Sequence, residues 1–268
     1  MKKQTLFVAF AFGVASVFAQ DLTSKKGETI LPEAGDWGVS VNANPFLNYA
    51  GNFIGGNGLN TAPAANFLTT NQTITGKYFI DEKTAYRGGI RINFSSASTA
   101  TKVAAIPATS PATFVDDVTT VSGSNIGLTF GLEKRKGKTR LEGFYGAEAG
   151  LMFGSGKTTF EYGNDLSANN AITRTALTKG GSTFGFGLRG FIGAEYFILP
   201  KMSIGAEFGW GLAFNRTGEG ETTTDTWNGS AVESTTTNTG KSSSFGIDTD
   251  NMNSVFGPAG TIRLGLHF

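Results

Sequence analysis

Residues 203–214 read Ser-Ile-Gly-Ala-Glu-Phe-Gly-Trp-Gly-Leu-Ala-Phe, and this stretch decides the fold. Every second side chain is apolar: Ile204, Ala206, Phe208, Trp210, Leu212 and Phe214. The residues between them are small, apart from one glutamate, Glu207. Because successive side chains in a strand point to opposite faces, this alternation predicts a β-strand with one apolar face and one small, polar face.

Seven further segments repeat the alternation, near residues 37–44, 67–80, 86–94, 126–133, 140–153, 184–196 and 261–268. The connections alternate between turns of about five residues and long loops rich in Thr, Ser, Asn and Gly. These long loops lie near residues 51–66, 96–123, 154–181 and 215–253, and we expect them to pack no core of their own. Short turns and long loops in alternation predict an all-β, eight-stranded, antiparallel up-and-down transmembrane β-barrel.

The first residues indicate export. Lys2 and Lys3 precede an apolar stretch over residues 6–17 and the small residue Ala19, which is typical of a signal peptide cleaved after Ala19. A membrane-anchoring helix is the alternative, but the apolar run is shorter than the ~20 residues that a spanning helix needs. We therefore expect a signal peptide at 1–19, a periplasmic N-terminal segment at 20–35 and the barrel at 36–268.

Composition excludes several classes of function. The chain has no cysteine, so neither disulfides nor thiolate chemistry are available. Its formal charge is only +1, which gives no basis for nucleic-acid binding. The 38 glycines and 23 phenylalanines fit a tightly curved barrel with an aromatic outer surface.

Aromatic residues mark both ends of the predicted strands. Trp37, Tyr86, Tyr196 and Phe268 lie on the turn side, and Phe94, Phe153, Phe184 and Phe214 lie near the long loops. Two such rings are typical of the girdles at the interfaces of a membrane barrel. A secreted lipocalin-like barrel or sandwich is the alternative. The opposite face favours a membrane barrel, because glycine and serine are too small to solvate a sheet but suit a narrow lumen.

The last strand and two internal phrases resemble a known superfamily. Ile262, Leu264, Leu266 and Phe268 resemble the C-terminal signature by which outer-membrane barrels are recognised for insertion. Gly143-Phe144-Tyr145-Gly146-Ala147-Glu148 and Gly205-Ala206-Glu207-Phe208-Gly209-Trp210 resemble the strands of the small OmpA/OmpX-like barrels. The resemblance implies the outer membrane of a Gram-negative-type bacterium, contact with its lipid and with the barrel-insertion machinery, and a barrel with no peptidoglycan-binding domain after it.

Charged residues on the small, polar faces predict a plugged lumen. Lys77, Arg87, Arg91, Arg140, Arg189 and Arg263 face Glu133, Glu142, Glu148, Glu195 and Glu207. The interior of an eight-stranded barrel is just wide enough for side chains to fill. We expect an ion-pair network of Arg87, Arg91, Glu142, Glu148, Arg189, Glu195, Glu207 and Arg263, with Arg91, Glu148, Arg189, Glu207 and Arg263 near mid-height. The basic residues 134–138 are assigned to a solvated turn.

Sites for catalysis, metals or cofactors are not expected. His267 is the only histidine, and we assign it a hydrogen-bonding role at the periplasmic rim. Asp248 and Asp250 could contact calcium, but the remaining spacing of a calcium loop is missing, which favours a solvated loop. The phosphate-loop-like residues 154–158 lack the upstream glycine spacing and a following helix.

We therefore expect a non-enzymatic barrel that acts through its extracellular loops, in surface interaction, in envelope structure or as an accessory subunit of an outer-membrane complex. The alternative is a transporter or channel for small solutes or apolar ligands, and a lipid-modifying or proteolytic barrel is a third possibility. Pro45 and Pro258 further predict that pairing between the first and last strands stops near them, because proline donates no ladder hydrogen bond.

Overall fold

A computed structural model describes residues 22–43, 49–52, 54–56, 74–247, 256 and 260–268. These residues form twelve antiparallel strands, which confirms the all-β prediction. They are β1 (Trp37–Asn42), β2 (Ile74–Asp81), β3 (Thr84–Ala104), β4 (Phe114–Lys136), β5 (Leu141–Glu161), β6 (Thr173–Lys179), β7 (Thr183–Leu199), β8 (Met202–Thr217), β9 (Gly220–Trp227), β10 (Val232–Thr239), β11 (Ser242–Ile247) and β12 (Gly260–His267). In the described part of the chain, no helix has the length and apolar character needed to cross a bilayer.

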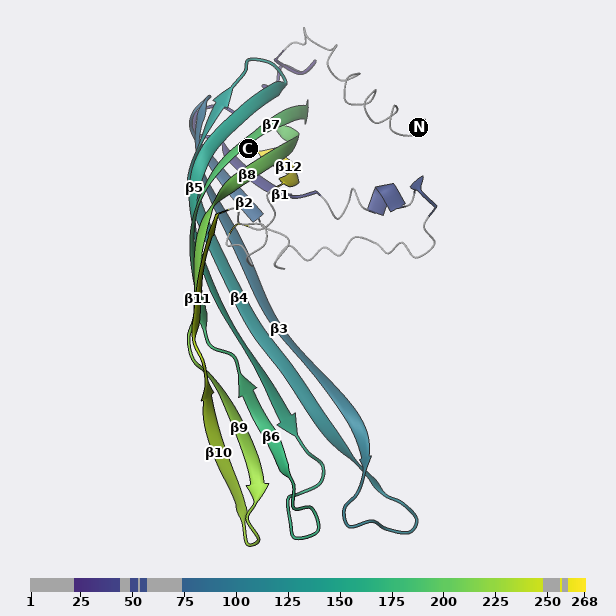
Figure 1. The fold of residues 1–268 in the computed structure, drawn as a ribbon. Helices are drawn as coiled ribbons and strands as arrows, with labels where there is room; N and C mark the ends of the chain where they lie inside the picture. Colours follow the sequence, from purple (N-terminus) through teal and green to yellow (C-terminus); the bar gives the residue numbers. More distant parts are fainter. Residues whose placement is uncertain (1–21, 44–48, 53, 57–73, 248–255, 257–259) are drawn as a thin grey trace, which may run out of the picture.

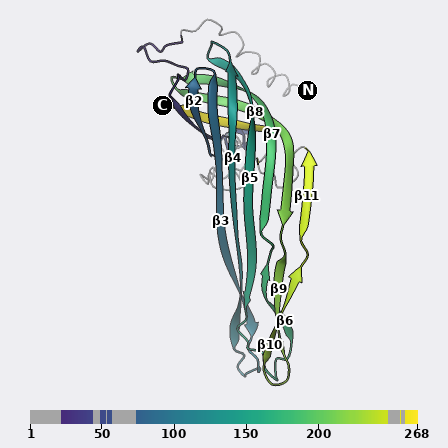
Figure 2. The same ribbon diagram turned by 90° about the vertical axis from the view of Figure 1, so that its left-hand side faces the viewer.

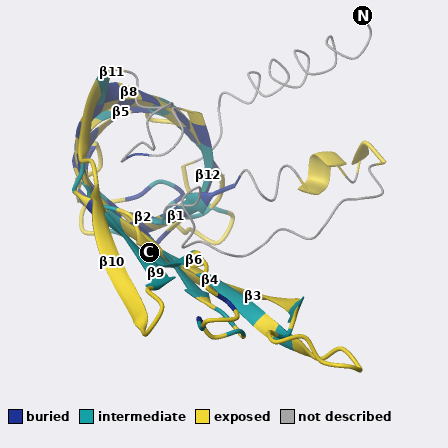
Figure 3. Ribbon diagram, turned by 60° about the horizontal axis from the view of Figure 1, so that its bottom comes forward, coloured by how far each residue is buried: buried dark blue, intermediate teal, exposed yellow. Residues whose placement is uncertain are grey.

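Eight of these strands pair in a closed ring. The order around it is β1, β2, β3, β4, β5, β7, β8, β12 and back to β1. The ring is seen end-on in Figure 3, with buried residues along its wall. β1 and β12 close it in the register Gly38↔His267 to Asn42↔Arg263.

Some predictions fall on residues that the structure does not describe. The signal peptide at 1–19, the upper half of the second predicted strand, Pro45, Pro258, Asp248 and Asp250 all lie outside the described residues. Between β1 and β12, one more backbone hydrogen bond is described beyond the paired residues: the Ala43 N–H donates to the Ile262 carbonyl at 2.7 Å.

The strands continue far beyond the ring, into segments expected to be loops. β3 and β4 stay paired without interruption from Thr84↔Lys134 to Ala104↔Phe114. β6, β9 and β10 add further strands beside β5. We call residues 96–123, 155–181 and 218–241 the extension; Figures 1 and 2 show it as a long curved sheet that leaves one end of the ring.

The prediction of loops was wrong for residues 96–123, 154–181 and 215–247, because a polar segment can still form paired strands. Threonine is β-branched and favours strands whether or not a core lies beneath it. Its hydroxyl groups also pair across strands in the extension, as between Thr223 and Thr236 at 3.0 Å. Ser98 and Thr120 form the same kind of contact at 2.8 Å.

An apolar belt surrounds the outside of the ring. Along β5, Leu141, Tyr145, Leu151 and Phe153 are exposed, while the alternate residues from Glu142 to Met152 point inward and are mostly buried. The belt ends abruptly on the side of the extension, where outward-facing Phe94, Phe153, Phe184 and Phe214 are each followed on their strands by a polar residue or glycine. The next outward-facing positions toward the extension, two residues beyond these phenylalanines, are Ser96, Ser155, Ser182 and Arg216.

The N-terminal segment folds against the opposite end of the ring, which we call the turn end. Ile30 is fully buried, and its carbonyl accepts a hydrogen bond from the Lys201 backbone N–H at 3.2 Å. Lys201 also forms an ion pair with Asp36. Burial raises the pKa of Asp36, but the hydrogen bond from Lys201 and the Glu33 backbone outweigh burial, so the pKa is lowered overall.

Candidate functional site

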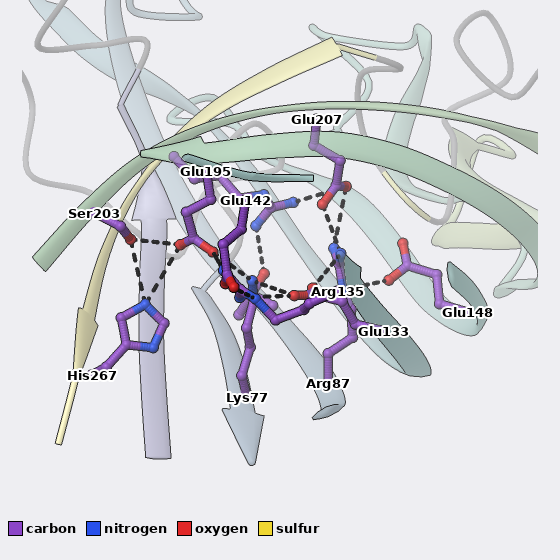
Figure 4. A network of polar contacts seen from close by, with 12 residues as sticks. Lys77, Arg87, Glu133, Arg135, Glu142, Glu148, Glu195, Ser203, Glu207 and His267 are labelled. Carbon is purple, nitrogen blue, oxygen red and sulfur yellow. Dashed lines mark hydrogen bonds and ion pairs between the residues drawn. The ribbon is translucent and has the colours of Figure 1, made fainter. Parts of the chain in front are cut away.

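A network of charged side chains fills the lumen near the turn end, as Figure 4 shows. Seven ring strands contribute to it, because each turns its small, polar face inward: Lys77 from β2, Arg87 from β3, Glu133 and Arg135 from β4, Glu142 and Glu148 from β5, Arg189 and Glu195 from β7, Glu207 from β8 and Arg263 from β12. All of these side chains are buried or nearly so.

Arg135 is the centre of the half of the network nearer the turn end. Its guanidinium donates to Glu142 Oε2 at 2.8 Å, to Glu195 Oε2 at 2.7 Å and to Glu133 Oε1 at 3.2 Å. Lys77 Nζ adds a second cation, at 3.0 Å from Glu133 and 3.5 Å from Glu195. Three carboxylates therefore share two cations in a space from which water is almost excluded.

Arg87 is the centre of the other half. It lies 2.6 Å from Glu207 and 3.1 Å from Glu148, and a longer contact of 3.7 Å to Glu133 joins the two halves. Arg189 bridges the same two carboxylates, Glu148 at 2.8 Å and Glu207 at 3.0 Å. Arg263 lies 3.8 Å from Glu207. Isolated buried charge is very unfavourable, so this mutual pairing is what allows so many charges inside the ring.

Aromatic rings fill the space around the charges. The Arg87 guanidinium lies 4.1 Å from the centre of the Phe191 ring, and Lys77 Nζ lies 5.0 Å from that of Phe144. Arg135 lies over both Phe79 and Phe197, at 5.4 and 5.6 Å. Two internal spaces of about 10 Å³ beside the charges each have room for about one water molecule.

The lumen glycines make room for these large side chains. A Cβ atom on Gly209 would lie 1.7 Å from Arg189 Nε, and one on Gly193 would lie 2.3 Å from the Phe144 ring. On Gly187 it would lie 2.6 Å from the ring of Phe256, which packs inside the ring of strands above Arg189. Alternating glycine with arginine, glutamate or phenylalanine thus lets a narrow lumen hold bulky groups.

The structure brings most of the predicted lumen residues together. Arg87, Glu142, Glu148, Arg189, Glu195, Glu207 and Arg263 all form ion pairs in the network. Arg91 is buried and lines the same small space as Arg263. Arg140 was expected to face the lumen but lies at the turn end, where it donates to the Ile198 carbonyl at 3.2 Å.

Arg135 is buried in the lumen, and the prediction that it lies in a solvated turn was wrong. The strand continues to Lys136, so Gly131, Glu133 and Arg135 all face inward. The signal was present, since the period-two alternation runs on through the basic residues. A run of basic residues does not by itself indicate a turn, whereas the alternation gives the direction of each side chain.

His267, Ser203 and Glu195 meet at the turn end of the lumen. Ser203 Oγ donates to Glu195 Oε1 at 2.5 Å, and His267 Nε2 lies 3.5 Å from the same oxygen. A serine nucleophile needs its hydroxyl directed at the imidazole and open to substrate. Here the hydroxyl is directed at the carboxylate and Ser203 is fully buried. The arrangement therefore orients His267 between Phe79 and Phe197.

The predicted girdle residues lie on the outside of the ring. Trp37, Tyr86, Phe94, Phe153, Phe214 and Phe268 are exposed and Tyr196 is partly exposed. Ring contacts join Trp37 to Tyr78 at 4.9 Å and Phe153 to Phe184 at 5.4 Å. Ile262, Leu264 and Leu266 lie on β12, and Phe268 exchanges backbone hydrogen bonds with Trp37. Among the described residues, no group of three or more His, Asp and Glu could hold a metal ion.

Comparisons with known proteins add little. No protein-family model matches the chain, and neither does any curated protein. Among solved structures, the outer membrane protein OprG from Pseudomonas aeruginosa is similar to it with a TM-score of 0.35 and 12% sequence identity, over 89% of this chain and 98% of that one. At this level of similarity, the function has to be argued from the molecule itself.

Proposed function

We propose that this chain is an outer-membrane β-barrel whose eight ring strands span the bilayer, whose lumen is closed, and which acts without catalysis through its extracellular extension. In this proposal the turn end faces the periplasm and the extension stands on the cell surface. There the extension serves in surface interaction, in envelope structure or as an accessory part of an outer-membrane assembly.

The apolar belt is the observation that carries the proposal. Its outward rows run from Ile204 to Phe214 on β8 and from Tyr86 to Phe94 on β3. These lengths match the ~9–11 residues that a tilted strand needs to cross the hydrocarbon core. A soluble barrel would place its charges outside and its apolar groups inside, whereas here the charges are inside.

Tryptophan fluorescence tests the membrane placement. The chain has three tryptophans: Trp37 at the turn end, Trp210 in the belt and Trp227 in the extension. Three variants each keep one tryptophan and carry phenylalanine in place of the other two. Each variant is reconstituted with lipids brominated at different depths. Because bromine quenches only on contact, we expect Trp210 to be quenched most by deep bromines, Trp37 by shallow ones and Trp227 by neither. Equal quenching of Trp210 and Trp227 would contradict the proposal.

The filled lumen predicts that the protein does not conduct. Paired arginines and glutamates occupy the lumen section from Arg135 to Arg189, with the ring of Phe79 against Arg135 and that of Phe256 against Arg189. We therefore expect no steady unitary current from the wild-type protein in planar bilayers. A reproducible single-channel conductance would instead favour the channel alternative.

The extension has the order that a recognition surface requires. Asn164 joins the ends of two hairpins, because its side chain accepts from Ile106 N–H at 2.8 Å and donates to the Ala104 carbonyl at 2.9 Å. Tyr162 donates to the Thr175 carbonyl at 2.8 Å, and its ring lies 4.4 Å from the Arg174 guanidinium. A surface held in place by such contacts loses little conformational entropy when it binds.

A further inference from the structure

We infer that the turn between β4 and β5 binds the headgroup of an anionic phospholipid in the leaflet at the turn end, an inference that rests on the proposed membrane placement. Residues 134–140, which we call the basic turn, read Lys-Arg-Lys-Gly-Lys-Thr-Arg. Lys134, Lys136 and Lys138 are exposed, while Arg135 points into the lumen. The three lysines are thus available to a ligand outside the ring.

The direction of these lysines points to lipid. On β4 the outward side chains are Leu128, Phe130, Leu132, Lys134 and Lys136, in that order. The row is apolar along the belt and becomes cationic one step beyond Leu132. If the belt lies in hydrocarbon, Lys134 and Lys136 lie at the level of the phosphate groups.

The neighbouring strands complete a site for a whole lipid. Lys134 pairs in register with Thr84 on one side and with Tyr145 on the other, and its Nζ donates to Thr84 Oγ1 at 2.8 Å. Tyr145 and Leu141 are both about half exposed on the outer face of β5. A phospholipid whose phosphate group binds the lysines would place its acyl chains against Tyr145, Leu141 and Leu132.

The basic turn carries three exposed lysines and no acidic residue. The neighbouring β2–β3 turn holds two acids, Asp81 and Glu82, together with Lys83, and the Asp81 carboxylate attracts Lys134 electrostatically. The carboxylate of Asp81 already accepts the Lys83 backbone N–H at 2.7 Å. Elsewhere around this border, Trp37, Ile80, Ile198, Leu199 and Phe268 are exposed apolar residues, and Lys201 is paired with Asp36. If the lysines served only to keep the turn in contact with water, they would not need to continue the outward-facing apolar row of β4.

The test measures lipid retention by native mass spectrometry of the full mature chain, after exchange with equal amounts of phosphatidylglycerol and phosphatidylcholine of the same acyl chains. The wild type should retain phosphatidylglycerol preferentially at low ionic strength. Each basic residue near an anionic surface contributes about fivefold to binding, so K134Q/K136Q/K138Q should lower this preference by on the order of a hundredfold. K136Q/K138Q keeps the Lys134–Thr84 hydrogen bond and should lower it about thirtyfold.

The matched control is K157Q/K179Q/K241Q, which removes three exposed lysines from the extension and should leave the preference unchanged. Equal retention of both lipids by the wild type, or equal losses in the basic-turn and control variants, would overturn the inference. Displacement of phosphatidylglycerol by excess inorganic phosphate would also overturn it, since the site would then recognise free phosphate. Quenching of Trp210 by brominated lipids is measured in parallel on the variant that keeps only Trp210: its absence would refute the membrane placement, whereas normal quenching without lipid preference would refute only the lipid site.

Discussion

Glu207→Ala is expected to lower the free energy of unfolding by about 3–5 kcal/mol, because it removes one partner from a buried ion-pair network. Glu207 lies 2.6 Å from Arg87, 3.0 Å from Arg189 and 3.8 Å from Arg263. Without it, the three guanidinium groups of Arg87, Arg189 and Arg263 face one another with two carboxylates left beside them, Glu148 and, 3.7 Å from Arg87, Glu133. The measurement is the midpoint of heat-induced unfolding in detergent, followed by the shift of the folded band on a gel.

Glu219→Ala is the control for this prediction. Glu219 lies in the extension, where its side chain is about half exposed and 3.8 Å from Lys241. An exposed pair of this kind contributes at most ~1 kcal/mol. Equal midpoints for the two variants would refute the plugged lumen. A conductance that the wild type shares with Glu207→Ala would refute it as well.

Arg135→Ala is expected to have an effect of similar size, about 3–5 kcal/mol, for the opposite reason. It would leave Glu133, Glu142 and Glu195 buried together, with Lys77 beside Glu133 and Glu195 and with Arg87 3.7 Å from Glu133. It would also remove the cation that lies over the rings of Phe79 and Phe197. Unfolding by urea in detergent, with the intrinsic fluorescence as the signal, gives the difference in free energy directly.

Lys138→Ala provides the comparison within the same basic turn. Lys138 is exposed, and an exposed substitution away from such features usually changes stability by no more than ~0.5 kcal/mol. If Arg135→Ala gives no folded protein, Arg135→Lys retains the charge while losing the forked hydrogen bonds, and should fall between the other two. A stability of Arg135→Ala equal to that of Lys138→Ala would show that Arg135 is solvated after all.

The alternation along each strand was enough to predict the antiparallel β fold and the polarity of the lumen. In β5, leucine and glutamate at neighbouring positions must point to opposite faces, so Leu141 and Glu142 can be assigned from the sequence. The same reasoning placed Arg189 and Glu207 on the inner face before their partners were known. These are local properties, since two neighbouring residues decide them.

Other features depended on which strands lie side by side and in what register. The sequence does not show that Arg87 meets Glu207, which is 120 residues away, because that contact depends on ring closure and on the stagger between strands. The Thr-rich strands β9 and β10 were missed because a polar strand has no apolar alternation, and their pairing becomes visible only once both are folded. Alternation therefore determined the direction of each side chain, and the closed ring decided its partner.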